Sequence, residues 1–115
     1  MEWWSKTRKK AEVRQMLKNT DLIFGFCDPR NEKLVAFTRG LTDFICKALI
    51  FDVIVDKSYR KSGLGKRLID EVLRHPRLKK VQHIELYCLP ELVPFYRKWE
   101  FTEKLGRLTF MRLKK

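Results

Sequence analysis

The sequence has few of the features that mark membrane, secreted or metal-binding proteins. Its apolar residues never continue for the about 18 positions that a membrane-spanning helix needs. The start, MEWWSKTRKK, lacks the apolar core of a secretory signal. Cys27, Cys46 and Cys88 are widely spaced and form no CxxC pair. We therefore predict reduced thiols in a cytoplasmic protein, with neither a disulfide framework nor a metal site.

Acidic residues are also scarce compared with basic ones. The 26 Lys and Arg against 14 Asp and Glu give a formal net charge of +12. Such a field favours an anionic partner: a nucleic acid, an acidic membrane or a phosphorylated small molecule. The alternative is a basic surface that is merely solvated, and composition alone does not separate the two.

The length of 115 residues, 44% of them hydrophobic, predicts one domain, residues 1–115, around a single core. No internal repeat or low-complexity linker divides it. Apolar spacing predicts a helix over 7–18, followed by strands over 21–27, 34–43 and 46–55. The short polar connections between these strands favour an antiparallel meander.

The second half of the chain predicts alternating helices and strands. A helix begins near Gly63 and ends before Pro76, and Pro94 lies either at the start of a later helix or at a kink in it. The remaining expected elements are a strand over 81–89, that later helix over 91–99 and a hairpin over 101–113. The sequence therefore predicts an α+β fold with a mixed central sheet and one strand–loop–helix–strand crossover.

The stretch VDKSYRKSGLGKRLI joins the third strand to the next helix. The first N–H groups of a helix lack intrahelical partners, and with the helix dipole they form an anion site. Gly63 and Gly65 remove side chains where a phosphate would approach the backbone. Four basic residues surround the same point: Arg60, Lys61, Lys66 and Arg67.

Two common nucleotide motifs do not account for this loop. A Walker loop requires GxxxxGK[ST] and a dinucleotide fingerprint requires GxGxxG, and the chain contains neither. A glycine-containing turn before a helix is common in proteins without any ligand. The local pattern thus leaves both a phosphate cradle and an ordinary loop open.

Two blocks together resemble the GNAT N-acetyltransferase superfamily. Arg60, Gly63 and Gly65 match the fixed positions of its pattern [RQ]-x-x-G-x-[GA] after a strand that ends in Val. LPELVPFYRKWEF, at 89–101, is similar to the family's late FYxKxGF block, and one strand separates the two blocks. The resemblance covers residues 7–115 and is closest to small bacterial and plastid-type members.

The resemblance implies acetyl-CoA as co-substrate and an amine as acceptor. In the family, the loop holds the pyrophosphate, and pantetheine inserts between two splayed strands as an additional strand. The second wall of that gap would be the strand Ile84–Cys88. The residues implied as cofactor-binding are Val53, Ile54, Val55, Arg60, Lys61, Ser62, Gly63, Leu64, Gly65 and Lys66.

Catalytic roles follow from the same resemblance. Tyr96 occupies the position of the general acid that protonates the coenzyme A thiolate, although an aromatic core residue is the alternative. Asp52 is the candidate general base, ahead of Asp43 and Glu85, because it lies on the strand that leads into the cofactor site and could accept a proton through water. The alternative is a carboxylate on the solvent-facing side of that strand. No Cys/His/acid pattern supports a nucleophile at Cys88, so direct transfer without an acyl-enzyme is expected.

The chain departs from the family pattern in two places. The usual first strand is missing before the first helix, and the sheet edge left open would recruit a second chain, so we expect a homodimer. Glu100 stands where the late block usually has glycine, and it carries strain if φ is positive there.

Two other functions remain open at this stage. One is a basic nucleic-acid-binding module, although the sequence contains no helix-turn-helix, zinc-finger or RNP signal. The other is a degenerate GNAT domain that binds coenzyme A without catalysis. The acceptor, either a small molecule or a protein amino group, cannot be read from the sequence.

Overall fold

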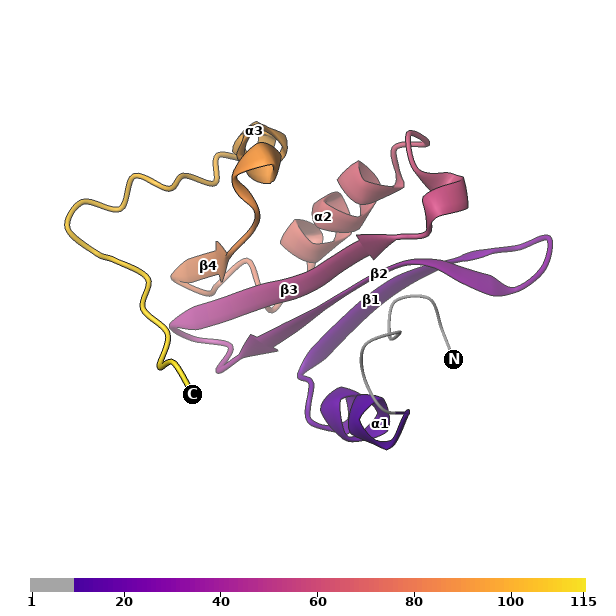
Figure 1. Ribbon diagram of the computed structural model, residues 1–115, viewed down its shortest axis with the longest axis horizontal. Helices are drawn as coiled ribbons and strands as arrows, with labels where there is room; N and C mark the ends of the chain where they lie inside the picture. Colours follow the sequence, from indigo (N-terminus) through magenta and orange to yellow (C-terminus); the bar gives the residue numbers. More distant parts are fainter. Residues whose placement is uncertain (1–9) are drawn as a thin grey trace.

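A four-stranded sheet in the order β1-β2-β3-β4 lies at the centre of the molecule (Figure 1). The structure is a computed structural model that describes residues 10–115. β1, β2 and β3 form an antiparallel meander, and β4 lies parallel to β3. Their bounds are Leu22–Asp28 for β1, Lys33–Thr42 for β2, Lys47–Val55 for β3 and His83–Leu86 for β4. This confirms the predicted fold class and meander.

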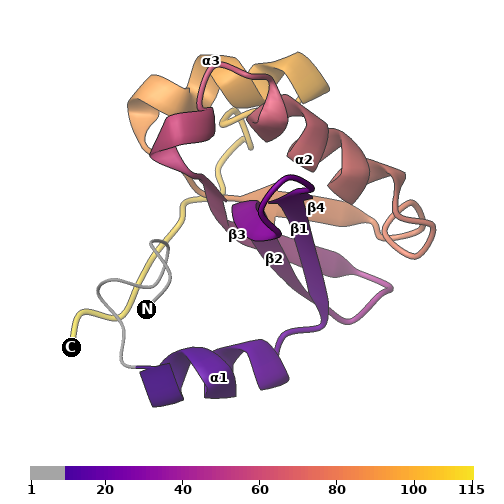
Figure 2. The same ribbon diagram turned by 90° about the vertical axis from the view of Figure 1, so that its right-hand side faces the viewer.

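Helices cover both faces of the sheet. Figure 2 shows α1 on one face and α2 and α3 on the other. Their bounds are Lys10–Lys18 for α1, Leu64–Arg74 for α2 and Val93–Tyr96 for α3. The helix expected over 91–99 is instead divided, because 3-10 turns at Pro90–Leu92 and Arg97–Trp99 flank α3. Pro94 lies in the first turn of α3, which is one of the two positions expected for it.

The core lies between the sheet and α2. Ala48 and Ile50 on β3 pack with Val72 on α2, and Leu78 and Val81 complete the cluster. Fully burying an aliphatic side chain of this kind contributes about 1.5–3 kcal/mol. The packing therefore fixes α2, and with it the loop that precedes α2, against β3.

β3 bends where the site begins. Phe37 pairs with Ile54 and Arg39 with Phe51, so two residues of β3 oppose one of β2. This bulge contains Asp52, whose φ of 57° lies in the left-handed region. β4 pairs with β3 only over Lys47–Ile50. Among the described residues, the rest of β3 therefore has no strand partner on its β4 side.

The expected final hairpin is not formed. Residues 101–115 contain no strand, and Leu108, Phe110 and Met111 are exposed. A ring contact of 5.3 Å between the centroids of Tyr87 and Phe110 joins this segment to the residue after β4. β4 has four residues and offers a short edge for further pairing. The expectation about a missing first strand falls on residues 1–9, which lie outside the described part of the chain.

Within residues 10–115, no helix is both long enough and apolar enough to cross a bilayer.

Candidate active site

The loop before α2 presents unused backbone donors. Gly63 is the N-cap of α2, with φ 81° and ψ 8°, and no side chain caps this end. The first helical hydrogen bond runs from the N–H of Arg67 to the carbonyl of Gly63, at 3.0 Å. Among the described residues, the N–H groups of residues 62–66 have no acceptor. These donors and the helix dipole can bind an anion.

Bonds within the loop fix its shape. The hydroxyl of Ser62 donates to the carbonyl of Tyr59, and Arg60 Nε donates to the carbonyl of Val55 at 3.3 Å. Lys61 has a φ of 68°, a left-handed conformation that costs a residue with a Cβ about 1–2 kcal/mol. Lys66 is turned along the helix and forms an ion pair with Asp70 at 3.1 Å. The predicted pyrophosphate residues thus form one continuous bend.

The predicted pantetheine residues lead directly into this bend. Val53, Ile54 and Val55 are half-buried and lie beyond the last β3–β4 pair. Ile54 and Val55 pair with β2 on their other side. Their edge toward β4 is therefore available to a ligand backbone among the described residues.

The late sequence block packs against the same helix. A Cβ built on Gly65 would lie 3.5 Å from Phe95 Cζ and 3.9 Å from Val55 Cγ2. Trp99 Nε1 donates to Asp70 Oδ1 on α2 at 2.8 Å. The two blocks, separated by a strand in sequence, therefore meet around the start of α2.

Tyr96 is buried within this aromatic cluster. Its ring centroid lies 5.0 Å from that of Phe95 and 6.1 Å from that of Phe101. Burial, with a smaller contribution from Cys88, raises the pKa of Tyr96 to about 12. The phenol therefore stays protonated at neutral pH, as a proton donor must before transfer. The packing is equally that of an aromatic core residue.

Asp52, in the bulge of β3, forms an ion pair with Arg39 on β2. Arg39 Nε donates to Asp52 Oδ2 at 2.7 Å, and the guanidinium lies 3.8 Å from the ring centroid of Phe51. Arg39 also donates to the hydroxyl of Thr20, in the segment that follows α1. The structure therefore joins Asp52 to the α1 side of the sheet, whereas Tyr96 lies with α2 and α3.

The two weaker base candidates also have partners. Asp43 accepts hydrogen bonds from the N–H groups of Ile45, Cys46 and Lys47, and these bonds hold its pKa below the usual range. Glu85 forms an ion pair with Lys47 at 3.4 Å. Asp43 therefore closes the turn between β2 and β3, away from the loop.

A buried carboxylate that no sequence motif marks lies beside the loop. Asp28 is 5% exposed and accepts a hydrogen bond of 2.6 Å from the hydroxyl of Tyr59. Hydrogen bonds, first from Arg30 and then from Tyr59, hold the pKa of Asp28 well below its usual range. The segment Asp-Pro-Arg-Asn was interpretable only as a turn, and nothing local linked it to Tyr59.

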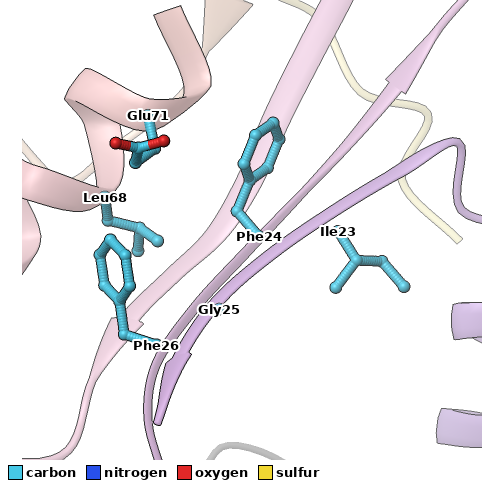
Figure 3. Close-up of a pocket in the computed structure, with 6 residues that line it drawn as sticks. All are labelled: Ile23, Phe24, Gly25, Phe26, Leu68 and Glu71. Atoms are coloured by element: carbon cyan, nitrogen blue, oxygen red, sulfur yellow. The ribbon is translucent and has the colours of Figure 1, made fainter. Parts of the chain in front are cut away.

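A separate cavity of about 230 Å³ lies between β1 and α2. Figure 3 shows Phe26 next to Leu68, while Ile23 points away from α2. The residues that line it are Ile23, Phe24, Gly25, Phe26, Leu68 and Glu71. None of the predicted site residues lines this cavity.

Comparison with known proteins assigns the chain to a family. The family model described as the acetyltransferase (GNAT) family matches residues 1–101. The chain belongs to the GNAT acetyltransferase family. A protein from Xanthomonas campestris, assigned to the same family, superposes with a TM-score of 0.82 at 28% identity, covering 97% of this chain and 76% of that one.

Curated GNAT relatives are longer than this chain. GCN5-related N-acetyltransferase 1, chloroplastic, from Arabidopsis thaliana is 32% identical over 94 residues, 82% of this chain and 48% of the relative. The uncharacterized N-acetyltransferase ycf52 of Pyropia yezoensis is 32% identical over 101 residues, 86% of this chain and 57% of the relative. The chain therefore spans about half the length of these relatives.

Proposed function

We propose that the chain is an N-acetyltransferase that binds acetyl-CoA and moves its acetyl group directly to a primary amine. The observation that carries this proposal is the continuous path from the open edge of β3 to the uncapped start of α2. The edge supplies backbone groups for an amide-containing chain, and the helix start supplies donors for a diphosphate. Pantetheine followed by pyrophosphate has these two chemistries in this order.

Each part of the cofactor has a proposed set of contacts. Val53, Ile54 and Val55 would bind pantetheine through their backbone groups. The segment from Arg60 to Lys66 would bind the pyrophosphate through its N–H groups and its positive charge. The net charge of +12 would also speed capture of the anionic cofactor.

Tyr96 is the proposed general acid. The amine nitrogen attacks the thioester carbonyl, a C–N bond forms, and the C–S bond breaks as the tetrahedral intermediate collapses. The departing thiolate then takes the phenolic proton of Tyr96. The place of Tyr96 in the late block supports this role, and a phenol is protonated throughout the neutral range. Burial, which raises the pKa of Tyr96 to about 12, makes it a weaker acid than an exposed phenol.

Asp52 is proposed as the base that accepts the amine proton through water. Its ion pair with Arg39 supports a second role for the same side chain, which is to fix the bulge of β3. Replacing Asp52 with asparagine separates the roles. Loss of kcat with loss of the acidic limb of the pH profile supports the base. A lower melting temperature with unchanged kcat assigns Asp52 to the bulge alone.

The acceptor, assembly and location belong to the same proposal. Relatives are named for different acceptors, including serotonin N-acetyltransferase 2, chloroplastic, of Oryza sativa and histone acetyltransferase TAP1 of Glycine max. A small amine and a protein amino group are both compatible acceptors.

We expect a single domain, a cytoplasmic location and a homodimer that forms through a sheet edge. A monomer by light scattering at high concentration would count against the dimer.

Calorimetry with acetyl-CoA and an assay over an amine panel test the function. Binding together with coenzyme A release supports the transferase. Binding without turnover over the panel favours a coenzyme A-binding domain without catalysis, a candidate supported by the engagement of Asp52 with Arg39. No acetyl-CoA binding, with salt-sensitive binding of nucleic acid, would favour the basic nucleic-acid module.

A further inference from the structure

We propose that Tyr59 and Asp28 are positioning residues of the cofactor site, holding the pyrophosphate loop in its binding shape from the end of β1. This inference rests on the proposed function. Tyr59 ends the 3-10 turn Lys57–Tyr59 and directly precedes Arg60. Its hydroxyl donates to Asp28 Oδ2 at 2.6 Å, across 31 positions of sequence. The bond joins the loop to the end of β1.

Asp28 is a rigid acceptor for this bond. Its side chain is almost fully buried, and Arg30 donates to it from the backbone N–H at 2.9 Å, from Nε at 3.1 Å and from Nη2 at 2.8 Å. Hydrogen bonds to a charged group are shorter and stronger than neutral ones. The carboxylate is therefore fixed within its own turn and can hold the phenol in one place.

A second carboxylate holds the other end of the same 3-10 turn. Asp56 is 6% exposed and accepts from the N–H of Ser58 at 2.9 Å. Its own N–H donates to the carbonyl of Val35 at 2.7 Å, and Lys33 Nζ lies 3.0 Å from its carboxylate. The start of the 3-10 turn is thus bound to β2, and its end is bound to the last residue of β1.

The bond from Ser62 to the carbonyl of Tyr59 carries this constraint into the loop itself. The loop needs such support, because Lys61 is left-handed and the donors of residues 62–66 have no acceptor among the described residues. A strained conformation persists only where its surroundings determine it. A loop already held in shape also pays less ordering entropy when its ligand binds.

Both carboxylates, Asp28 and Asp56, are paired with cations. Two carboxylates near an anion site would repel a pyrophosphate if they were unpaired. Arg30 neutralises Asp28 and Lys33 neutralises Asp56; Arg30 lies in the turn between β1 and β2, and Lys33 is the first residue of β2. The loop therefore gains two strong acceptors without a local negative charge.

Replacing Tyr59 with phenylalanine removes only the hydroxyl. We expect KM for acetyl-CoA to rise about tenfold, with kcat and the KM for the amine unchanged. S-acetylpantetheine lacks the pyrophosphate, so the variant and the wild type should use this donor equally well. Asp28→Asn should weaken acetyl-CoA binding similarly, and the double variant should lose little more than the larger single loss, because both act through one bond.

Thr42→Val is the matched control, since it also removes one hydroxyl from a hydrogen bond of 2.6 Å, here to the carbonyl of Lys47, at the end of β2 that lies away from the loop. This control variant should have the wild-type KM for acetyl-CoA and for S-acetylpantetheine. An unchanged KM for acetyl-CoA in Tyr59→Phe would overturn the positioning role while leaving the transferase intact. If Tyr59→Phe lost activity equally with acetyl-CoA and with S-acetylpantetheine, the loss would reflect general structural damage, and the positioning role would be overturned. If the wild type bound no acetyl-CoA, the proposed function would fail together with this inference.

Discussion

Replacing Gly63 with alanine should damage cofactor binding more than it damages the fold. Gly63 has a φ of 81°, and a Cβ built on it would meet no protein atom within 4 Å. The cost to stability is therefore the backbone cost alone, about 1–2 kcal/mol for a left-handed residue that carries a Cβ. For a domain of roughly 100 residues, each kcal/mol lowers the melting temperature by about 4–8 °C. The variant should remain folded at room temperature.

The new methyl group would stand in the open space that the proposed pyrophosphate occupies. Holding the phosphate away from the N–H groups loses at least one charge-assisted hydrogen bond, so acetyl-CoA affinity should fall by about tenfold or more. Thermal unfolding measures the loss of stability in Gly63→Ala, and calorimetry with acetyl-CoA measures the loss of affinity.

Two glycine controls separate strain from binding. Gly106 has a φ of 68° and also faces open space, but it lies in the C-terminal segment. Gly106→Ala therefore introduces the same kind of strain and should leave acetyl-CoA binding unchanged. Gly65→Ala makes ordinary contacts of 3.5 and 3.9 Å and replaces a helical glycine, so its stability should be unchanged or higher by up to about 1 kcal/mol. If Gly63→Ala lowered the melting temperature but bound acetyl-CoA as tightly as wild type, the assignment of the loop would be refuted.

Three further predictions concern the late block. Tyr96→Phe should lower kcat by about 100-fold or more with little change in acetyl-CoA affinity, and an unchanged kcat would exclude the acid role. Glu100 has a φ of 68°, as suspected from its place in the block, so Glu100→Gly should stabilise the domain by about 1 kcal/mol; no rise in melting temperature would contradict this. The pKa of Tyr96 rises from 10.0 to about 12, so its contribution to stability is present below pH 10 and is lost as pH rises toward 12. Between pH 9 and 11, roughly, wild type should therefore lose more stability than Tyr96→Phe, and equal losses in unfolding titrations would argue against the shift.

The parts of the fold that depend on local signals could be predicted from the sequence. The meander follows from short polar turns, and α2 follows from apolar spacing between Gly63 and Pro76. The loop bend could be located because its glycines precede that helix directly. Glycine at this place in the family pattern made strain at Glu100 conditional on a positive φ, and the structure has a φ of 68° there.

The parts that depend on distant contacts could not be predicted. Asp52 meets Arg39 only because a bulge shifts the register between β2 and β3, and no local pattern reports that shift. Tyr59 meets Asp28 across 31 positions for a similar reason. The final hairpin was expected with Gly106 near its turn, but β4 is only four residues long and residues 101–115 form no strand against it. A strand-like segment forms a strand only where its packing and pairing partners exist.

Titration of the purified chain with acetyl-CoA in a calorimeter tests the central claim most directly. We expect saturable binding of one acetyl-CoA per chain, with a dissociation constant in the range of about 1 μM to 1 mM that is typical of enzyme substrates. Free coenzyme A should compete, and Gly63→Ala should weaken the binding while Gly106→Ala does not. The absence of saturable binding at about 1 mM acetyl-CoA, with a cooperatively folded protein, would contradict the account.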